Sequence, residues 1–156
     1  MKVFRLAMEK PGLYLADDLS GNGAAISGGR WNPKGRRVLY SCCNASTAVL
    51  ETLVHLSGLL PAGGFFLVTL DMPDVAFENA YQPELPPDWA ELDRDPGTTA
   101  EIGRQWLERG EQLAMRVPSV VCQADFNLLL NPLHPEMSSV RVIRKEPFKI
   151  DPRLFS

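Results

Sequence analysis

Glu51 lies on a segment whose other positions are mostly apolar, which makes it the first residue to consider for chemistry. On a helical wheel at about 100° per residue, the segment from Ala45 shows one narrow polar stripe at i, i+4 and i+8. The stripe comprises Thr47, Glu51 and His55. A carboxylate on an otherwise buried helix needs a partner or a ligand. The apolar positions flank the stripe, with Ala45, Ala48, Val49, Leu53 and Leu56 on one side and Leu50 and Val54 on the other.

Two roles for Glu51 are compatible with this pattern. In the structural role, the carboxylate forms an ion pair with an arginine such as Arg30, Arg36 or Arg37 and closes the core, as buried carboxylates commonly do. In the chemical role, the carboxylate faces a cleft and stabilises positive charge that develops on a substrate, as beside an oxocarbenium-like centre. The pattern alone does not choose between them.

Residues 28–32, Gly-Gly-Arg-Trp-Asn, could hold an anion. The two glycines let the backbone approach a ligand closely, and Arg30 offers a fork of donors that fits phosphate oxygens. The segment is also compatible with a turn that carries a surface arginine and a core tryptophan. Tyr40, which ends a predicted strand just before the helix of Glu51, could form the wall of a pocket or fill the core.

Other catalytic and metal-binding chemistries find little support. Ser119 follows Pro118 but lacks the GxSxG context of a serine hydrolase. His55 and His134 are isolated, and isolated histidines are usually structural. Two histidines and three scattered thiols make a poor metal site, so no metal is expected. The thiols belong to Cys42, Cys43 and Cys122.

The composition is that of one soluble domain. The chain has 156 residues, 45% of them hydrophobic and 22% charged, so we expect a single domain over residues 1–156 with a sizeable core. A net charge of -3 without a long basic run argues against direct nucleic-acid binding. We see neither a signal peptide nor a run of about 20 apolar residues, and the odd number of cysteines suits reduced thiols. A cytoplasmic protein without membrane contact is therefore predicted.

Predicted strands outnumber predicted helices. Strands are expected over residues 3–6, as an edge or first strand, and over 37–40 and 64–72. Residues 140–150 are expected to form a closing strand or a hairpin, and two short strand-like runs are expected within 113–122. Helices are expected over 45–57, capped by Asn44 and stopped by Gly58, and over 98–109, capped by Thr98 or Thr99 and closed by Gly110. Loops are expected over 16–36, 73–97 and 127–135.

This order of elements favours an α+β fold over a doubly wound parallel sheet, because strands and helices do not alternate regularly. A dinucleotide-binding Rossmann unit is also disfavoured. The only Gly-x-Gly, at Gly21 and Gly23, lacks the third glycine and a strong preceding strand.

Taken together, these residues resemble the pattern of the RES domain, a family named for its arginine, glutamate and serine. The resemblance runs from about Val3 to the tail at residues 148–154, with several motifs in the family's order. The motifs are Phe4-Arg5-Leu6, Gly28-Gly29-Arg30-Trp31-Asn32, Val38-Leu39-Tyr40, Glu51 within residues 48–55, Val117-Pro118-Ser119, Asn127 and Asn131-Pro132-Leu133-His134-Pro135.

The resemblance implies an α+β domain similar to the catalytic domains of ADP-ribosyltransferase toxins, with NAD+ held in a cleft as the substrate and no metal. Glu51, Arg30 and Tyr40 would then be catalytic, with Glu51 stabilising the cation that forms as nicotinamide leaves. The NAD+-binding residues would be Arg5 and Arg30 on the pyrophosphate, Tyr40 against the nicotinamide or its ribose, and Ser119 and Asn127 on ribose hydroxyls or the carboxamide.

The implied activity is that of the toxin of a type II toxin–antitoxin system that degrades NAD+ by cleaving the nicotinamide–ribose bond. The alternative is transfer of ADP-ribose to a cellular protein, which shares the first step. The implied partner is a cognate Xre-like antitoxin with a helix-turn-helix region, with which the toxin could form an oligomeric assembly and through which alone it would contact DNA. A third possibility, a binding module in which Glu51 and Arg30 form only a structural pair, predicts no NAD+ turnover.

Overall fold

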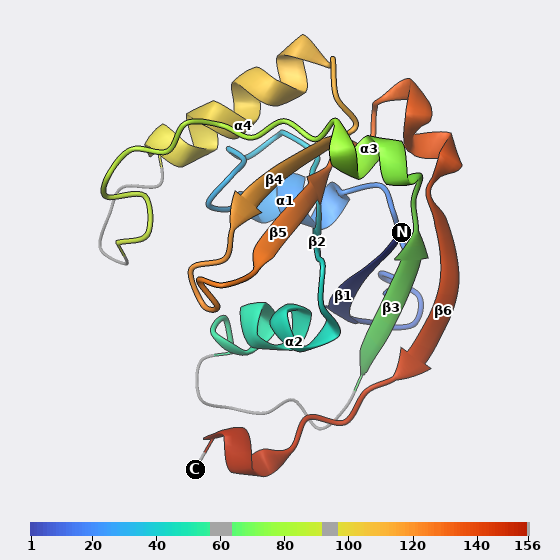
Figure 1. The fold of residues 1–156 in the computed structure, drawn as a ribbon. Helices are drawn as coiled ribbons and strands as arrows, with labels where there is room; N and C mark the ends of the chain where they lie inside the picture. The colour runs from blue at the N-terminus through green and yellow to red at the C-terminus, as the bar shows by residue number, and fades with distance from the viewer. Residues whose placement is uncertain (57–63, 92–96, 156) are drawn as a thin grey trace.

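Six antiparallel strands form the frame of the computed structural model, which describes residues 1–56, 64–91 and 97–155 (Figure 1). The strand order is β4-β5-β2-β1-β3-β6, and each neighbouring pair is antiparallel. The expected α+β class is therefore confirmed. The strands are β1 (Lys2–Met8), β2 (Leu39–Cys42), β3 (Phe65–Asp71), β4 (Ala114–Pro118), β5 (Phe126–Leu130) and β6 (Arg141–Pro147).

The two helices predicted from hydrophobic periodicity are present as α2 (Ala45–Leu53) and α4 (Gly97–Arg109). Thr98 and Thr99 lie inside α4 instead of capping it, and Gly58 falls outside the described residues. Two further helices, α1 (Asn22–Ser27) and α3 (Asp74–Glu78), lie in segments predicted as loops, because six and five residues are too few to show a helical period. The 3-10 helices are η1 (Pro135–Ser139) and η2 (Pro152–Phe155). None of the described helices has the length and apolar character needed to cross a membrane.

Alternation along the strands divides the sheet into two faces. Cys42 pairs with both Phe4 of β1 and Asn127 of β5, so these residues share one face with Tyr40. On this face α4 packs through Trp106 and α2 through Val49 and Leu53, whereas α3 lies on the other face. The face that carries Tyr40 and Asn127 is thus the one on which the helix of Glu51 lies.

Residues 3–6 were predicted as an edge or first strand; they lie in the first strand, β1, which is interior in the sheet and not at its edge. β1 pairs with β3 along its whole length, from Lys2 opposite Asp71 to Met8 opposite Phe65. Its pairing with β2 is limited to Phe4 and Cys42. The two halves of the sheet, β4-β5-β2 and β1-β3-β6, are therefore joined at a single register position.

The segment predicted as a loop over 127–135 begins with a buried strand. Leu128, Leu129 and Leu130 of β5 are fully buried, and β5 pairs with β2 on one side and β4 on the other. The loop prediction failed because asparagines at both ends of this short apolar run resemble turn residues. Burial on both faces of an interior strand accounts for the continuous leucines.

Helix α2 is buried on one side only, which corrects the expectation that both of its apolar sides are covered. Leu50 and Val54 are 36% and 58% exposed. Val49, Leu53 and Leu56 instead pack against Leu6, Phe65 and the C-terminal Ile150. The polar stripe of the helix therefore runs along the border between a packed side and an open side.

Candidate active site

Glu51 joins α2 to the turn after β4 and to strand β5. Its Oε1 accepts one hydrogen bond from Ser119 Oγ and another from Asn127 Nδ2, each over 2.7 Å. Within the described ranges no lysine or arginine forms a salt bridge with Glu51, and Arg36 pairs with Glu108 instead, over 2.6 Å. The structural role proposed for Glu51, an ion pair with an arginine, is not observed in this part of the chain.

Ser119 is fully buried and directs its proton at the carboxylate. The hydroxyl oxygen accepts a hydrogen bond from the backbone N–H of Cys122 over 2.9 Å, so the remaining O–H is free to donate to Glu51. The backbone N–H of Ser119 donates to the carbonyl oxygen of Asp125 over 2.9 Å. The turn after β4 thereby holds Ser119 through both its hydroxyl oxygen and its backbone N–H.

Asn127 bridges the carboxylate to a buried thiol. A carboxylate only accepts hydrogen bonds, so the amide must turn its NH2 to Glu51 and its oxygen to Cys42, whose Sγ lies 3.2 Å from Oδ1. Burial raises the pKa of the Cys42 thiol, and the negative charges of Glu51 and Asp125 raise it further. The thiol is therefore protonated at neutral pH and able to donate to Asn127.

The consequence for Glu51 is a carboxylate that is held by one oxygen only. Oε1 carries both donors, whereas no described residue donates to Oε2. The Glu51 side chain is partly exposed. A carboxylate in this state is oriented before any ligand arrives and keeps one oxygen for it, as preorganised electrostatic stabilisation requires.

Tyr40 lies on the same sheet face as Asn127 and is fixed by residues 31 and 32. Its hydroxyl donates to Asn32 Oδ1 over 2.7 Å and accepts from the backbone N–H of Trp31 over 3.2 Å. Burial raises the pKa of Tyr40, the hydrogen bond from Trp31 and the positive charge of Arg30 oppose this, and the charge of Glu51 adds to it. Tyr40 is thus a neutral phenol that lies within electrostatic range of both Arg30 and Glu51.

Gly29, which precedes Arg30, lies against the side chains of Tyr40 and Asn32. A Cβ at Gly29 would lie 2.8 Å from the Tyr40 hydroxyl and 3.0 Å from Asn32 Oδ1. Arg30 Nη1 donates to the carbonyl oxygen of Trp89 over 2.8 Å, and the Trp31 ring, 2% exposed, lies 6.3 Å from that of Trp89. Trp31 is therefore a core residue, while Arg30 keeps most of its donors for another partner.

Arg5 is placed apart from Glu51. Alternation along β1 puts its side chain on the face opposite Tyr40 and Asn127. Its Nη1 donates to the backbone carbonyl of Asp18 over 2.9 Å. Burial lowers the pKa of this guanidinium, and the negative charge of Asp18 raises it. The contacts of Arg5 thus attach it to the loop before α1, and its expected role on NAD+ phosphate stays a prediction.

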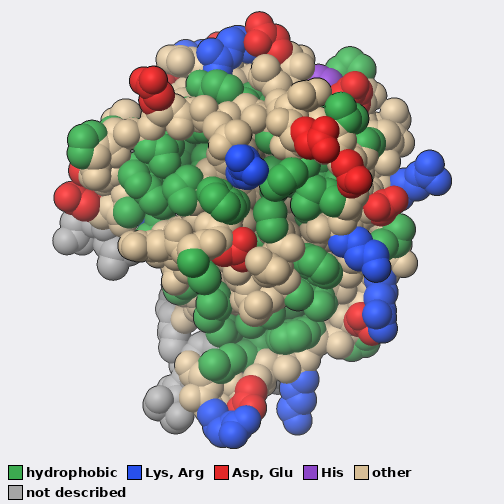
Figure 2. All heavy atoms as spheres, in the orientation of Figure 1, with side chains coloured by type: hydrophobic (Ala, Val, Ile, Leu, Met, Phe, Trp, Pro, Cys, Tyr) green, Lys and Arg blue, Asp and Glu red, His purple; other side chains and the backbone are tan. Residues whose placement is uncertain are grey.

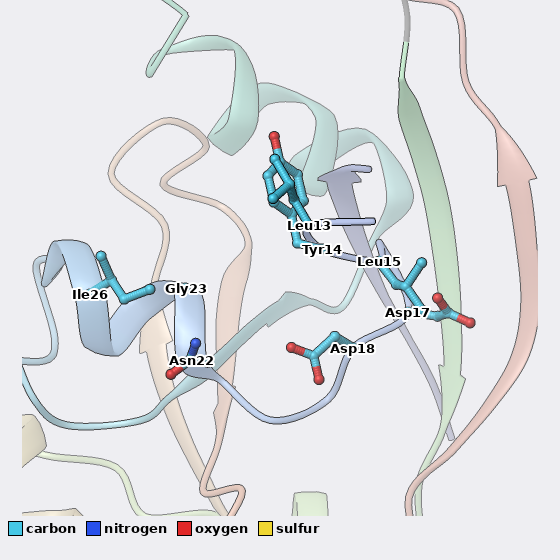
Figure 3. Close-up of a pocket in the computed structure, with 8 residues that line it drawn as sticks. All are labelled: Leu13, Tyr14, Leu15, Asp17, Asp18, Asn22, Gly23 and Ile26. Atoms are coloured by element: carbon cyan, nitrogen blue, oxygen red, sulfur yellow. The ribbon is translucent and has the colours of Figure 1, made fainter. Parts of the chain in front are cut away.

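A hollow of about 530 Å³ opens between that loop and α1 (Figure 3). Its volume falls within the range of small-molecule sites. The helix α1 leads from the hollow directly to residues 28–30, and Asn32 Nδ2 donates to the carbonyl of Ala24 in α1 over 2.9 Å. Helix α1 therefore connects the hollow to Trp31 and Asn32, the residues that hold the Tyr40 hydroxyl. The residues that line it are Leu13, Tyr14, Leu15, Asp17, Asp18, Asn22, Gly23 and Ile26.

The histidines stand outside the Glu51 cluster. His134 Nδ1 accepts from the backbone N–H of Glu136 over 3.2 Å and so begins η1, and His55 is exposed beyond the end of α2. Across the described ranges no group of three His, Cys, Asp or Glu side chains is arranged to hold a metal ion.

Three residues with a part in this arrangement were not predicted from the sequence. Asn32 orients Tyr40, Cys42 donates to Asn127, and Asp125 contacts both α2 and the turn of Ser119. Asn32 stood inside a recognised motif, so its type was a usable signal. Cys42 and Asp125 gave none, because their partners are 85 and 78 positions away.

Comparison with known proteins identifies the family of this chain. The family model described as the RES domain matches residues 2–151. A protein of Sphingobium sp. (strain YBL2) named Prs ADP-ribosylating toxin is 39% identical over 147 residues, 90% of this chain and 89% of that protein. The Toxin Res of Yersinia enterocolitica is 36% identical over 155 residues, 99% of each. A chain in the crystal structure of the M. tuberculosis MbcT–MbcA toxin–antitoxin complex has the same fold, with a TM-score of 0.70 and 18% identity over 99% of this chain and 86% of that one.

Proposed function

The chain belongs to the RES domain family, and on that premise we propose that it is a toxin that degrades NAD+ by cleaving the bond between nicotinamide and ribose. The observation that carries this proposal is the state of Glu51. Ser119 and Asn127 hold one carboxylate oxygen, and the other has no described donor. A negative charge fixed in this way is suited to a centre that becomes positive during the reaction.

The reaction begins with loss of nicotinamide from ribose C1′. The C1′–N bond breaks and its electron pair leaves with nicotinamide, so the pyridinium becomes neutral and C1′ gains oxocarbenium character. The Oε2 side of Glu51 would stabilise this cation. A water oxygen then bonds to C1′ and releases a proton, which gives ADP-ribose; phosphate as the acceptor would give ADP-ribose 1″-phosphate. Stabilisation confined to the transition state raises the rate, because it leaves ground-state binding unchanged.

Tyr40 and Arg30 would position the dinucleotide next to Glu51. The Tyr40 ring is immobilised through its hydroxyl, so it can form a rigid wall for nicotinamide or its ribose. Arg30 donates one hydrogen bond to Trp89 and can direct its other N–H groups at the pyrophosphate. Ser119 and Asn127 act in this proposal through Glu51, and contacts of theirs with ribose remain predictions.

Transfer of ADP-ribose to a cellular protein is the second candidate. The name of the Sphingobium relative, an ADP-ribosylating toxin, favours it. Both reactions begin with the loss of nicotinamide, and in both Glu51 would stabilise the cation at C1′. They differ only in the nucleophile that bonds to C1′.

An antitoxin is the proposed partner. The matching solved structure is a toxin–antitoxin complex. The face seen in Figure 2 carries broad areas of apolar side chains, interrupted by a few basic and acidic side chains, and large exposed apolar areas are typical of a surface that binds another protein. An Xre-like antitoxin would supply the DNA contact that a chain of net charge -3 does not offer by itself.

Nicotinamide release tests the function. The purified protein is incubated with NAD+ and no acceptor protein, and nicotinamide is measured by chromatography beside Glu51→Gln and Glu146→Gln. Glu146 lies on β6, at the sheet edge opposite β4, and pairs with Arg144. Release by the parent and Glu146→Gln but not by Glu51→Gln supports degradation. Release only when cell extract is added, with labelled ADP-ribose on one protein, favours transfer, and no release under either condition would overturn both.

A further inference from the structure

Asp125 connects the two elements that meet at Glu51. It is 8% exposed, and its Oδ2 accepts hydrogen bonds from Thr47 Oγ1 and from Asn44 Nδ2, the latter over 2.8 Å. Both donors lie at the beginning of α2. Oδ1 accepts from the backbone N–H of Phe126 over 2.7 Å. Among the described residues, this carboxylate therefore accepts hydrogen bonds from the start of α2 and from the start of β5.

The backbone of Asp125 closes the turn that carries Ser119. Its N–H donates to the carbonyl of Cys122, and its carbonyl accepts from the N–H of Ser119, each over 2.9 Å. Within the same turn the Ser119 hydroxyl accepts from Cys122. One residue thus fixes the turn through its main chain and the helix through its side chain.

The polar stripe of α2 is consequently attached at two points one helical turn apart. Thr47 bonds to Asp125, and Glu51, four residues later, bonds to Ser119 and Asn127. Two such points fix both the rotation of the helix and its distance from the sheet, whereas the Glu51 contacts alone would fix only one of them. An anion at the first turn is also favoured by the partial positive charge of a helix N-terminus.

We propose that Asp125 is a positioning residue for Glu51: by holding Thr47 and the turn of Ser119 together, it sets the geometry in which Glu51 Oε1 is engaged and Oε2 is left for the substrate. This role rests on the proposed function. Asp125 itself touches neither the reacting atoms nor Glu51, so its effect passes through α2. A displacement of about 1 Å at a reacting group is enough to cost a large factor in rate.

Thr47 and Thr52 provide a matched pair of variants on one helix. Thr47→Val removes the hydroxyl that reaches Asp125 and keeps the shape of the side chain. Thr52→Val makes the same change to a hydroxyl that donates to the backbone carbonyls of Leu6 and Ala48. Asp125→Asn removes the charge and turns one acceptor into a donor that faces Thr47 and Asn44. Thr47→Ser keeps the hydroxyl and should recover most of the loss.

Steady-state kinetics with NAD+ separate positioning from stability. We expect Asp125→Asn and Thr47→Val to lower kcat by about tenfold or more with KM within about twofold of the parent, since the ground-state contacts to NAD+ remain. Thr52→Val should match the parent. The measurements are made well below each variant's melting temperature, so that unfolded protein does not lower the measured kcat. A parent-like kcat in folded Asp125→Asn and Thr47→Val would overturn the proposal.

The side-chain amide of Asn127 gives a second measurement that does not need turnover. Its two 15N-attached protons report the bond to Glu51, and they are assigned from the pair lost in Asn127→Asp. Glu51→Gln should shift this pair. Asp125→Asn and Thr47→Val should shift it in the same direction, while Thr52→Val should not. An unmoved Asn127 pair in Asp125→Asn refutes positioning even if NAD+ is cleaved. A shifted pair in Asp125→Asn, together with no nicotinamide release by the parent, upholds positioning and rejects the proposed function.

Discussion

The hydroxyl of Ser119 donates to Glu51 Oε1 over 2.7 Å, although 68 positions separate the two residues in the chain. The bond exists because β4 pairs with β5, and the start of β5 contacts α2 through Asp125 and Asn127, so the turn between these strands lies next to the helix. Two of the three residues that the resemblance to the RES domain predicts for the site are therefore in direct contact. The third predicted residue, Arg30, donates to Trp89 and lies next to Trp31, whose backbone N–H donates to the Tyr40 hydroxyl.

The first prediction concerns the charge of Glu51. Glu51→Gln keeps an oxygen that can accept from Ser119 and Asn127, so the fold should be preserved. Nicotinamide release should fall by about 10²-fold or more, because a neutral amide does not stabilise a developing cation. Thermal melting checks the fold and single-turnover nicotinamide release checks the rate. A folded variant whose rate stays within a few-fold of the parent would remove Glu51 from the mechanism.

The second prediction concerns Gly29. Gly29→Ala places a methyl group 2.8 Å from the Tyr40 hydroxyl, so Tyr40 and Asn32 must move and their hydrogen bond should weaken. We expect a loss of about 1–3 kcal/mol in unfolding free energy, as for other overpacked sites. Gly23→Ala is the control, because a methyl there meets nothing within 4 Å. Urea denaturation of both variants is the measurement, and equal stabilities would contradict the close packing of Gly29 on Tyr40.

The elements that could be predicted from the sequence are those with a long local pattern. The polar stripe of Thr47 and Glu51 is visible because residues four apart lie on one side of a helix, and both residues do make the contacts that join α2 to the turn between β4 and β5. The strand from Phe65 to Asp71 was equally visible from its apolar run. For these elements, the local sequence carries the information that selects the structure.

The contacts that complete the site could not be predicted, since they depend on strand order. Asn127 reaches Glu51 only because β5 lies between β2 and β4, and a segment read as a loop gave no reason to expect that. Arg5 shows the converse limit. Its place in a motif indicated a ligand contact, but alternation along β1 puts it on the face opposite Tyr40. A motif identifies residues in order and does not state on which side of a sheet they lie.

The third prediction concerns the guanidinium of Arg30. Arg30→Lys keeps the charge but loses the planar fork, so NAD+ affinity should weaken by about 1–3 kcal/mol if Arg30 binds the pyrophosphate. Arg5→Lys tests the same role for Arg5, and Arg144→Lys on the distant β6 is the control. Titration calorimetry with NAD+ in the Glu51→Gln background avoids turnover. Affinity unchanged in both Arg30→Lys and Arg5→Lys would exclude a phosphate role for these arginines.

The fourth prediction concerns pH and Asp125. Burial raises the pKa of this carboxyl, but hydrogen bonds from Thr47, Asn44 and Phe126 outweigh it, and the pKa is lowered overall. A carboxyl with a lowered folded-state pKa stabilises the fold above its unfolded value, about pH 4, and this contribution is lost as pH falls through the folded value. The stability difference between the parent and Asp125→Asn should therefore be largest near pH 7 and shrink below pH 4. Melting curves at stepwise lower pH measure it, and a constant difference would contradict an ionised Asp125.

The last prediction concerns the cell in which the chain is made without its antitoxin. If the acceptor at C1′ is water or phosphate, each turnover consumes one NAD+ and nothing in the cell limits the reaction except the NAD+ pool. Induced expression in a bacterial host should then arrest growth as total NAD+ falls, while Glu51→Gln should change neither. Co-expression of the cognate antitoxin should restore both growth and NAD+.

If the acceptor is one protein, turnover stops when that protein is fully modified, so growth should stop with NAD+ nearly level and with one ADP-ribosylated band on a blot. NAD+ measured by enzymatic cycling in the same cultures as the blot decides between the two, because a fall in NAD+ without a modified band supports degradation and a band without a fall supports transfer.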